Sequence, residues 1–261
     1  MGAMFRAAFV VVCAGCGFRT GHAPAVGDSP ATGSDDAPSD VAVIDTAIAD
    51  APPDGQVVGS GPALVQLHNS EGAGLGLVTV ALTAQAAGNL NVVFVGWYHS
   101  GAINSVTDTA GNTYTNIGNN ARNMENQAIF YSCKIKAAPA GNVVTATFAA
   151  AAQDPDVRVA EYSGIISSSS CLDVATSLGG TGTAMDSGNL TTTNAHDLLV
   201  AGTFQLYSAS APDPAYRNRG VTGFGDLTED REVTTTGTYH ATATQSMSAD
   251  WVVSLAAFKA Q

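Results

Sequence analysis

Basic residues are scarce in this sequence. The 261 residues include 10 Lys or Arg and 22 Asp or Glu, so the formal net charge is −12 at pH 7, and the lysines are Lys134, Lys136 and Lys259 alone. Binding to nucleic acid and docking on anionic lipid both depend on clustered Lys and Arg side chains. The composition therefore argues against nucleic acid, and against a lipid surface held by charge.

A long apolar run is also missing. A membrane-spanning helix needs about 20 consecutive apolar residues, and the run at residues 7–12, after Arg6, is far shorter. One positive residue, a short apolar run and the small residues Ala14 and Gly15 are typical of an export signal that is removed from the mature protein. We expect residues 1–15 to be such a signal peptide.

Cys16 follows Ala14 and Gly15, and this pattern resembles the lipobox of bacterial lipoproteins. The resemblance implies that Cys16 becomes the acylated first residue, although Cys13 stands where that family usually has an aliphatic residue. Several acyl chains hold a protein at the membrane effectively permanently, whereas one chain binds only marginally. The alternative is an ordinary secretory signal that is cut between Ala14 and Ala23.

Residues 16–61 have the composition of a tether. No Lys or Arg occurs between Arg19 and Arg122. The acidic residues of this segment are Asp28, Asp35, Asp36, Asp40, Asp45, Asp50 and Asp54. A self-repelling chain with few hydrophobic residues cannot bury enough apolar surface to fold. We expect a disordered, lipid-anchored linker that spans on the order of 35 Å.

Two cysteines lie outside the signal and the anchor. Removal of Cys13 and acylation of Cys16 leave Cys133 and Cys171, which an oxidising compartment would allow to join. We expect a disulfide between them. The alternatives are two free buried thiols or a metal site, and the metal site is weakly supported because neither cysteine belongs to a C-x-x-C or Cys/His cluster.

Helical periodicity is nearly absent from residues 62–261. Apolar, β-branched and aromatic residues alternate with period two, and clusters of Gly, Asn, Asp and Pro interrupt them. We expect about ten to thirteen strands. Residues 127–136 form the clearest one, with Cys133 facing inward, while residues 90–99 and 197–207 are apolar on both faces and suit central strands. The other expected strands are residues 64–68, 76–82, 143–148, 157–163, 229–235, 239–244 and 250–258.

These strands predict an all-β fold. Uneven and partly long loops favour a single antiparallel β-sandwich over a barrel. Immunoglobulin units have about 100 residues, so two of them could fill the length. The lack of an internal repeat favours one jelly-roll-like domain over residues 62–261.

Three motifs resemble an uncharacterised domain of exported bacterial proteins. They are TDTAGNTY at residues 107–114, EYSG at 161–164 with LDV at 172–174, and WVVSLAAF at 251–258. The likeness covers most of the chain after Gly88. It implies a surface-exposed β-sandwich, and it carries no catalytic residues to transfer.

Two pairs of residues are candidates for ligand binding. Oxygen atoms of Asp108 and Asn112 could meet a calcium ion, with an Asx turn at Gly111 as the simpler interpretation. Calcium is the one cofactor that the sequence suggests. Trp97 and His99 project from one side of a central strand and could form a platform for a sugar ring, with core packing as the simpler interpretation.

Catalytic signals are weak. The histidines are scattered, and no G-x-S-x-G or metal-protease spacing occurs. Glu161 could act as an acid if its carboxyl group faced the core, and Asp173 and His99 are further suspects. A hydrogen-bonded structural role is the simpler interpretation of Glu161.

The function classes that remain share an extracellular location. We expect an exported, cell-surface lipoprotein that presents a β-sandwich binding or adhesion module, with carbohydrate or a cell-surface protein as its partner. The membrane would be contacted through the lipid anchor only. The alternatives are a passive structural protein of the envelope and, less favoured, a secreted hydrolase.

Overall fold

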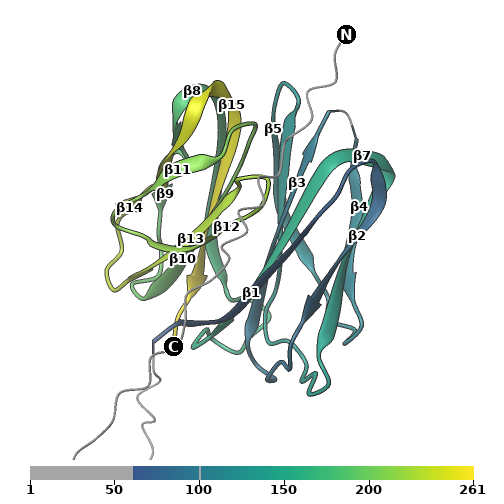
Figure 1. Cartoon of the computed structure of the whole chain (residues 1–261). Coiled ribbons are helices and arrows are strands. Elements are labelled where there is room, and N and C mark those ends of the chain that lie inside the picture. The colour runs from purple at the N-terminus through teal and green to yellow at the C-terminus, as the bar shows by residue number, and fades with distance from the viewer. Residues whose placement is uncertain (1–60, 100) are drawn as a thin grey trace, which may run out of the picture. The chain divides into compact units, whose positions relative to one another are not determined.

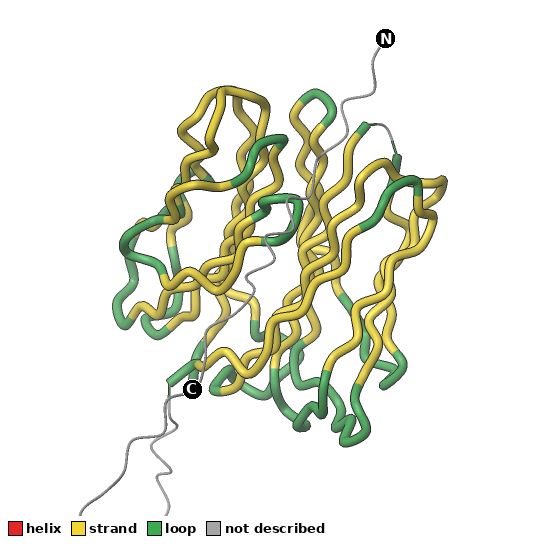
Figure 2. Tube along the Cα trace, in the orientation of Figure 1, coloured by secondary structure: helices red, strands yellow, loops and turns green. Residues whose placement is uncertain are grey.

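The structure is a computed structural model that describes residues 61–99 and 101–261. Every element within these residues is a strand (Figures 1 and 2). The expected signal peptide, Cys16 and most of the expected linker lie outside the described residues. The strands are β1 (Ala63–Glu71), β2 (Leu75–Leu82), β3 (Leu90–Tyr98), β4 (Ile103–Asp108), β5 (Thr115–Arg122), β6 (Glu125–Ser132), β7 (Asn142–Ser163), β8 (Leu172–Asp186), β9 (Leu190–Thr191), β10 (Asp197–Gln205), β11 (Ala209–Pro212), β12 (Arg217–Val221), β13 (Leu227–Val233), β14 (Thr238–Tyr239) and β15 (Thr242–Lys259).

Two antiparallel sheets form the sandwich. The N-terminal sheet has the strand order β1-β7-β3-β6-β5, and β2 and β4 also pair with β7. The C-terminal sheet has the order β11-β15-β10-β13-β12, and β8 pairs with β15. Strands β9 and β14 form a separate pair. The expected all-β, antiparallel sandwich is confirmed.

Strand β7 belongs to two layers. Its first half pairs with β2 and β4, and its second half pairs with β1 and β3. The two halves meet at Asp154, whose φ is 46°, next to Pro155. The sequence predicts two strands here, at residues 143–148 and 157–163, but the structure has one strand of 22 residues. This strand carries β2 and β4 over one face of the N-terminal sheet (Figure 1).

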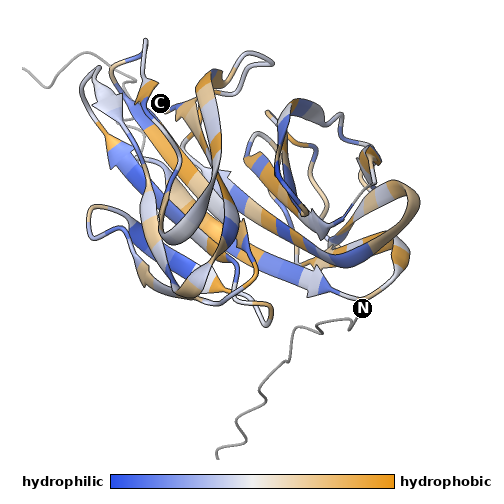
Figure 3. Cartoon of the chain, turned by 90° about the horizontal axis from the view of Figure 1, so that it is seen from above, coloured by the Kyte–Doolittle hydropathy of each residue, from blue (hydrophilic) through white to orange (hydrophobic). Residues whose placement is uncertain are grey.

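Hydrophobic residues fill the spaces between the layers. Val78, Val93 and Val144 belong to the core that lies under β2 and β4, and Phe94 and Phe258 belong to the core between the two sheets. In Figure 3 hydrophobic and hydrophilic residues alternate along many of the strands, as expected for strands with one buried face. Strands β3 and β10 are buried along their whole length, which confirms their prediction as central strands.

The predicted disulfide joins Cys133 to Cys171. Their Cα atoms lie 6.0 Å apart, within the usual range for a disulfide. The bond ties the end of β6 to the start of β8. A closed loop of this length stabilises a domain by roughly 3 to 4 kcal/mol in the chain-entropy model. The disulfide also indicates an oxidising, extracytoplasmic location for this domain.

Two phenylalanines and two glycines set the closest approach of the sheets. A methyl group on Gly202 of β10 would lie 2.6 Å from ring atoms of Phe94 of β3, and one on Gly96 of β3 would lie 2.0 Å from the ring of Phe204 of β10. Each ring therefore occupies the space above a glycine of the opposite sheet. Neither position can accept a larger residue without displacing an aromatic ring.

Replacement of Gly202 tests this packing. Gly202→Ala is expected to destabilise the protein by about 1 to 3 kcal/mol, because the new methyl group overpacks the core. Gly76→Ala is the matched control, since no atom lies within 4 Å of its added Cβ. Guanidinium unfolding of both variants measures the difference. Equal stability of the two variants would show that the rings do not need these glycines.

Candidate functional site

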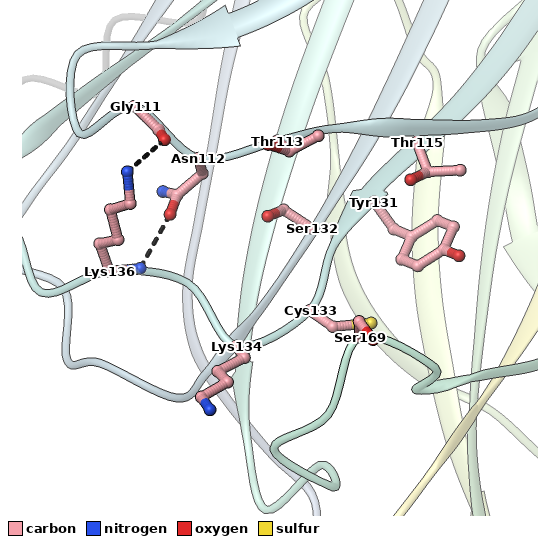
Figure 4. A pocket seen from close by; sticks show the side chains of 10 residues that line it. All are labelled: Gly111, Asn112, Thr113, Thr115, Tyr131, Ser132, Cys133, Lys134, Lys136 and Ser169. Carbon is pink, nitrogen blue, oxygen red and sulfur yellow. Dashed lines mark hydrogen bonds between the residues drawn. The ribbon is translucent and has the colours of Figure 1, made fainter.

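A hollow of about 320 Å³ opens beside the disulfide (Figure 4). We call it the lysine pocket, because two of the three lysines of this acidic chain line it. Five of its residues carry hydroxyl groups. The lining residues are Gly111, Asn112, Thr113, Thr115, Tyr131, Ser132, Cys133, Lys134, Lys136 and Ser169.

The two lysines come from a short segment that is fixed on both sides. Strand β6 ends at Ser132 instead of continuing to Lys136, because Lys134 has a φ of 51° and leaves the extended conformation. The disulfide holds Cys133. Ile135 is buried, and its N–H donates to the carbonyl of Asn89 at 2.9 Å. A lysine held at positive φ between two anchored neighbours is a local strain that often marks functional segments.

Lys136 connects this segment to the opposite wall of the pocket. Its Nζ donates to the carbonyl oxygen of Gly111 at 2.6 Å, and its backbone N–H donates to Oδ1 of Asn112 at 2.8 Å (Figure 4). The second wall is thus the turn between β4 and β5. Gly111 takes a φ of 71° in this turn, which glycine adopts without a steric penalty.

Asp108 holds the turn together. Its carboxylate accepts hydrogen bonds from the backbone N–H and the side-chain amide of Asn112, from Tyr114 and from Asn142, at 2.7 to 2.9 Å. Burial alone would raise the pKa of Asp108, but these hydrogen bonds outweigh it and lower the pKa. The sequence allows either a calcium site or an Asx turn at Asp108 and Asn112. The geometry is that of the turn, since protein donors already surround the carboxylate of Asp108.

A closed ring of hydrogen bonds continues from Asp108 into the interior. Gln85 donates to Asn91 at 2.8 Å, Asn91 donates to Tyr114 at 3.0 Å, and Asn142 donates back to Gln85 at 2.8 Å. Burial raises the pKa of Tyr114 well above its ordinary value, so the hydroxyl group stays protonated and donates to Asp108. The ring fixes one wall of the lysine pocket from behind.

Trp97 and His99 have different environments. Trp97 is 3% exposed and packs edge-on against Phe148, with their ring centroids 5.7 Å apart. It belongs to the core beneath β2 and β4 and presents no ring face to solvent. His99 is exposed and has a φ of 63°. Of the two residues that the sequence suggests as a sugar platform, the structure therefore buries Trp97 in the core and leaves His99 at the surface.

Glu161 and Asp173 each have protein partners of their own. Glu161 is fully buried and accepts hydrogen bonds from Gln66 and Asn89, both at 2.6 Å. Asp173 accepts the backbone N–H of Thr193 at 2.6 Å. Burial would raise the pKa of Asp173, but hydrogen bonds from Thr193 and Asn194 lower it. Both carboxylates are thus engaged in holding β-strands and loops.

Three pairs of carboxyl groups, which the sequence did not reveal, lie in or beside the C-terminal sheet: Asp156 with Asp226, Asp213 with Glu229, and Asp173 with Asp197. Burial raises the pKa of Glu229 to about 8; the N–H of Asp213 opposes this, and the charges of Asp213 and Asp230 add to it. Burial likewise raises the pKa of Asp197 to about 6. None of these carboxyl groups lines the lysine pocket.

In residues 61–99 and 101–261, no group of three or more His, Cys, Asp or Glu side chains is placed to hold a metal ion. This part of the chain also contains no helix that could span a membrane.

Comparisons with models of protein families, with curated proteins and with solved structures find no match to this chain. The resemblance to a domain of exported bacterial proteins therefore stays a prediction. The lysine pocket was missed in the sequence, although one signal was present. Lys134 and Lys136 are two residues apart, next to a cysteine, in a chain with only three lysines.

The raised pKa values predict a pH-dependent stability. The ordinary pKa of Glu229 is 4.5 and its folded pKa is about 8, so the folded state binds more protons between these values. The stability contribution is complete below pH 4.5 and is lost as the pH rises to 8. A difference of one pKa unit between the folded and unfolded states corresponds to about 1.4 kcal/mol of stability. That amount alone would make the Tm about 3 to 6 °C higher at pH 5 than at pH 8.

Calorimetry at pH 5 and pH 8 measures this difference. Glu229→Gln mimics the protonated side chain, so its Tm should fall less between the two pH values than that of the unaltered protein. Asp36→Asn, in the acidic N-terminal segment, should leave the fall unchanged. A Tm that rises from pH 5 to pH 8 would contradict the assignment.

Proposed function

We propose that this chain is an exported surface lipoprotein whose β-sandwich is a glycan-binding module, and that the lysine pocket is its binding site. The observation that carries the proposal is the composition of a preformed hollow. Its hydroxyl, amide, ammonium and backbone carbonyl groups supply both donors and acceptors. Sugar hydroxyl groups need both, and specific ligand sites combine a preformed cavity with a few fixed polar groups.

The lining favours binding over hydrolysis. Glycoside hydrolysis ordinarily uses two carboxyl groups that flank the scissile bond. No Asp, Glu or His is among the described residues that line the lysine pocket. The pair formed by Asp156 and Asp226 is shielded from a substrate, since both residues are 0% exposed. A secreted hydrolase is therefore the weaker proposal.

Paired lysine variants test the binding site. Lys134→Ala combined with Lys136→Ala should weaken binding of the preferred glycan at least tenfold, which corresponds to about 1.4 kcal/mol. The matched control is Lys259→Ala, which removes the remaining lysine of the chain outside the pocket. A glycan array with the mature chain identifies the ligand, and titration calorimetry measures the affinities.

Two outcomes would refute this assignment. One is an array on which the mature protein binds no glycan. The other is an equal loss of affinity in the double variant and in Lys259→Ala. Thermal unfolding of each variant shows whether a loss of binding reflects a loss of folding instead.

The membrane attachment has its own test. If Cys16 is the acylated residue, cells that express the native chain should yield a membrane-bound species that begins at Cys16 and carries the mass of acyl groups. Cys16→Ala should abolish both the mass increase and the membrane association. Intact-mass analysis of membrane and soluble fractions decides the matter. A soluble, unmodified native chain would show that the protein is released instead of anchored.

A further inference from the structure

A second hollow, of about 370 Å³, lies between β5 and β8. Ile117 and Ile129 contribute apolar surface to it, and Asn119, Asn120, Thr176 and Ser177 contribute polar groups. Strands β5 and β8 are edge strands of the two sheets, because β5 pairs only with β6 and β8 pairs only with β15. The hollow therefore follows the side of the sandwich on which two sheet edges face each other.

The two hollows are consecutive along the same strands. Thr115 lines the lysine pocket, and Ile117, two residues further along β5 at a register shift between Asn116 and Gly118, lines the second hollow. On β6, Tyr131 lines the first and Ile129 lines the second. Thr115 pairs with Tyr131 across the two strands, and Gly118 pairs with Ile129. The two hollows share no lining residue but follow one another along β5 and β6, and we call the two together the edge groove.

The edge groove has two different ends. At one end lie Lys134 and Lys136. At the other end, Asn120 of β5 donates to Ser177 of β8 at 3.1 Å and joins the two strands. From Thr115 in the lysine pocket to Asn120 in the second hollow, β5 advances by five residue steps, or about 17 Å. This length suits a linear oligomer better than a single sugar.

The edge of β5 is poorly suited to an added peptide strand. Strand addition requires free backbone groups along the edge. The N–H of Gly118 donates to its neighbour Asn116 at 2.8 Å, and the N–H of Ala121 donates to Asn120 at 2.8 Å. Side chains thus already occupy backbone donors along this strand, and the ligand has to be held by side chains instead.

The charge of the groove is confined to one end. Lys134 and Lys136 are its only charged lining residues among the described part of the chain. The nearby carboxylate of Asp108 is surrounded by protein donors. An acidic group of the ligand would therefore be attracted to the lysine end alone.

We propose that the edge groove binds a linear acidic oligosaccharide, with a carboxylate of a uronic-acid unit beside Lys134 and Lys136 and the following sugar units along β5. This inference rests on the proposed function, because the lysine pocket is its first subsite. It adds the class of glycan and the direction in which the chain extends.

Titration of the mature chain with galacturonic acid and its oligomers of increasing length tests the inference. Affinity should rise at least tenfold from the monomer to the hexamer. It should also fall with added salt, because exposed charges are screened. Neutral glucose oligomers of the same lengths should bind at least tenfold more weakly.

A blocking variant separates the two hollows. Ala175→Trp places a large ring in the second hollow, so the hexamer should bind no better than the monomer, while the affinity for the monomer stays unchanged. The matched control is Thr79→Trp, on an exposed position of β2, and it should leave both affinities unchanged.

The outcomes distinguish this inference from the proposed function. Lysine-dependent binding without any effect of ligand length or of Ala175→Trp would overturn the edge groove and leave the lysine pocket as a glycan site. Preference for neutral oligomers would overturn the acidic ligand. Binding of an extended peptide in place of any glycan would overturn both proposals.

Discussion

A buried guanidinium group bridges the two sheets. Arg158 of β7 is 1% exposed, and it donates to the carbonyl oxygens of Leu227 and Thr203 at 2.6 and 2.8 Å and to Gln127 at 3.0 Å. A buried charge is costly unless it is paired and hydrogen-bonded. Arg158 meets this condition only when the sheets are packed together, because its carbonyl partners belong to the C-terminal sheet and Arg158 belongs to the other. Its position therefore fixes how β7 lies against β10 and β13.

The surroundings of Arg158 explain the tight centre of the sandwich. The guanidinium lies 5.3 Å from the centroid of the Phe94 ring, and this ring covers Gly202 of the opposite sheet. Oδ1 of Asp156 lies 3.6 Å from Nε of Arg158. Burial raises the pKa of Asp156 well above its ordinary value, Arg158 opposes the rise, and Asp226 and Glu71 add to it. None of the residues of this centre lines either of the two hollows.

Local patterns predicted the strands and their faces but not what covers them. The alternation around Trp97 correctly placed it opposite Phe94 and Tyr98. It could not show that β2 and β4 bury Trp97, because that layer depends on the bend of β7 at Asp154. The alternation of residues predicts that the strand ending at Ser132 continues to Lys136. It does not, because the positive φ of Lys134 depends on the disulfide to the distant Cys171 and on the burial of Ile135. The disulfide was predictable from counting cysteines, whereas the lysine pocket needed the turn held by Asp108.

The net charge of the chain conceals how its charges are distributed. Of the 22 acidic and 10 basic residues, 15 acidic and eight basic residues lie in residues 61–261, so the formal charge of this part is −7. Protons held by the buried carboxyl groups of raised pKa, such as Glu229, reduce that charge further. Partner selection at a pocket depends on the charges within about a Debye length, roughly 8 to 10 Å at physiological salt. A chain of net negative charge can therefore still present a local site of positive charge at Lys134 and Lys136.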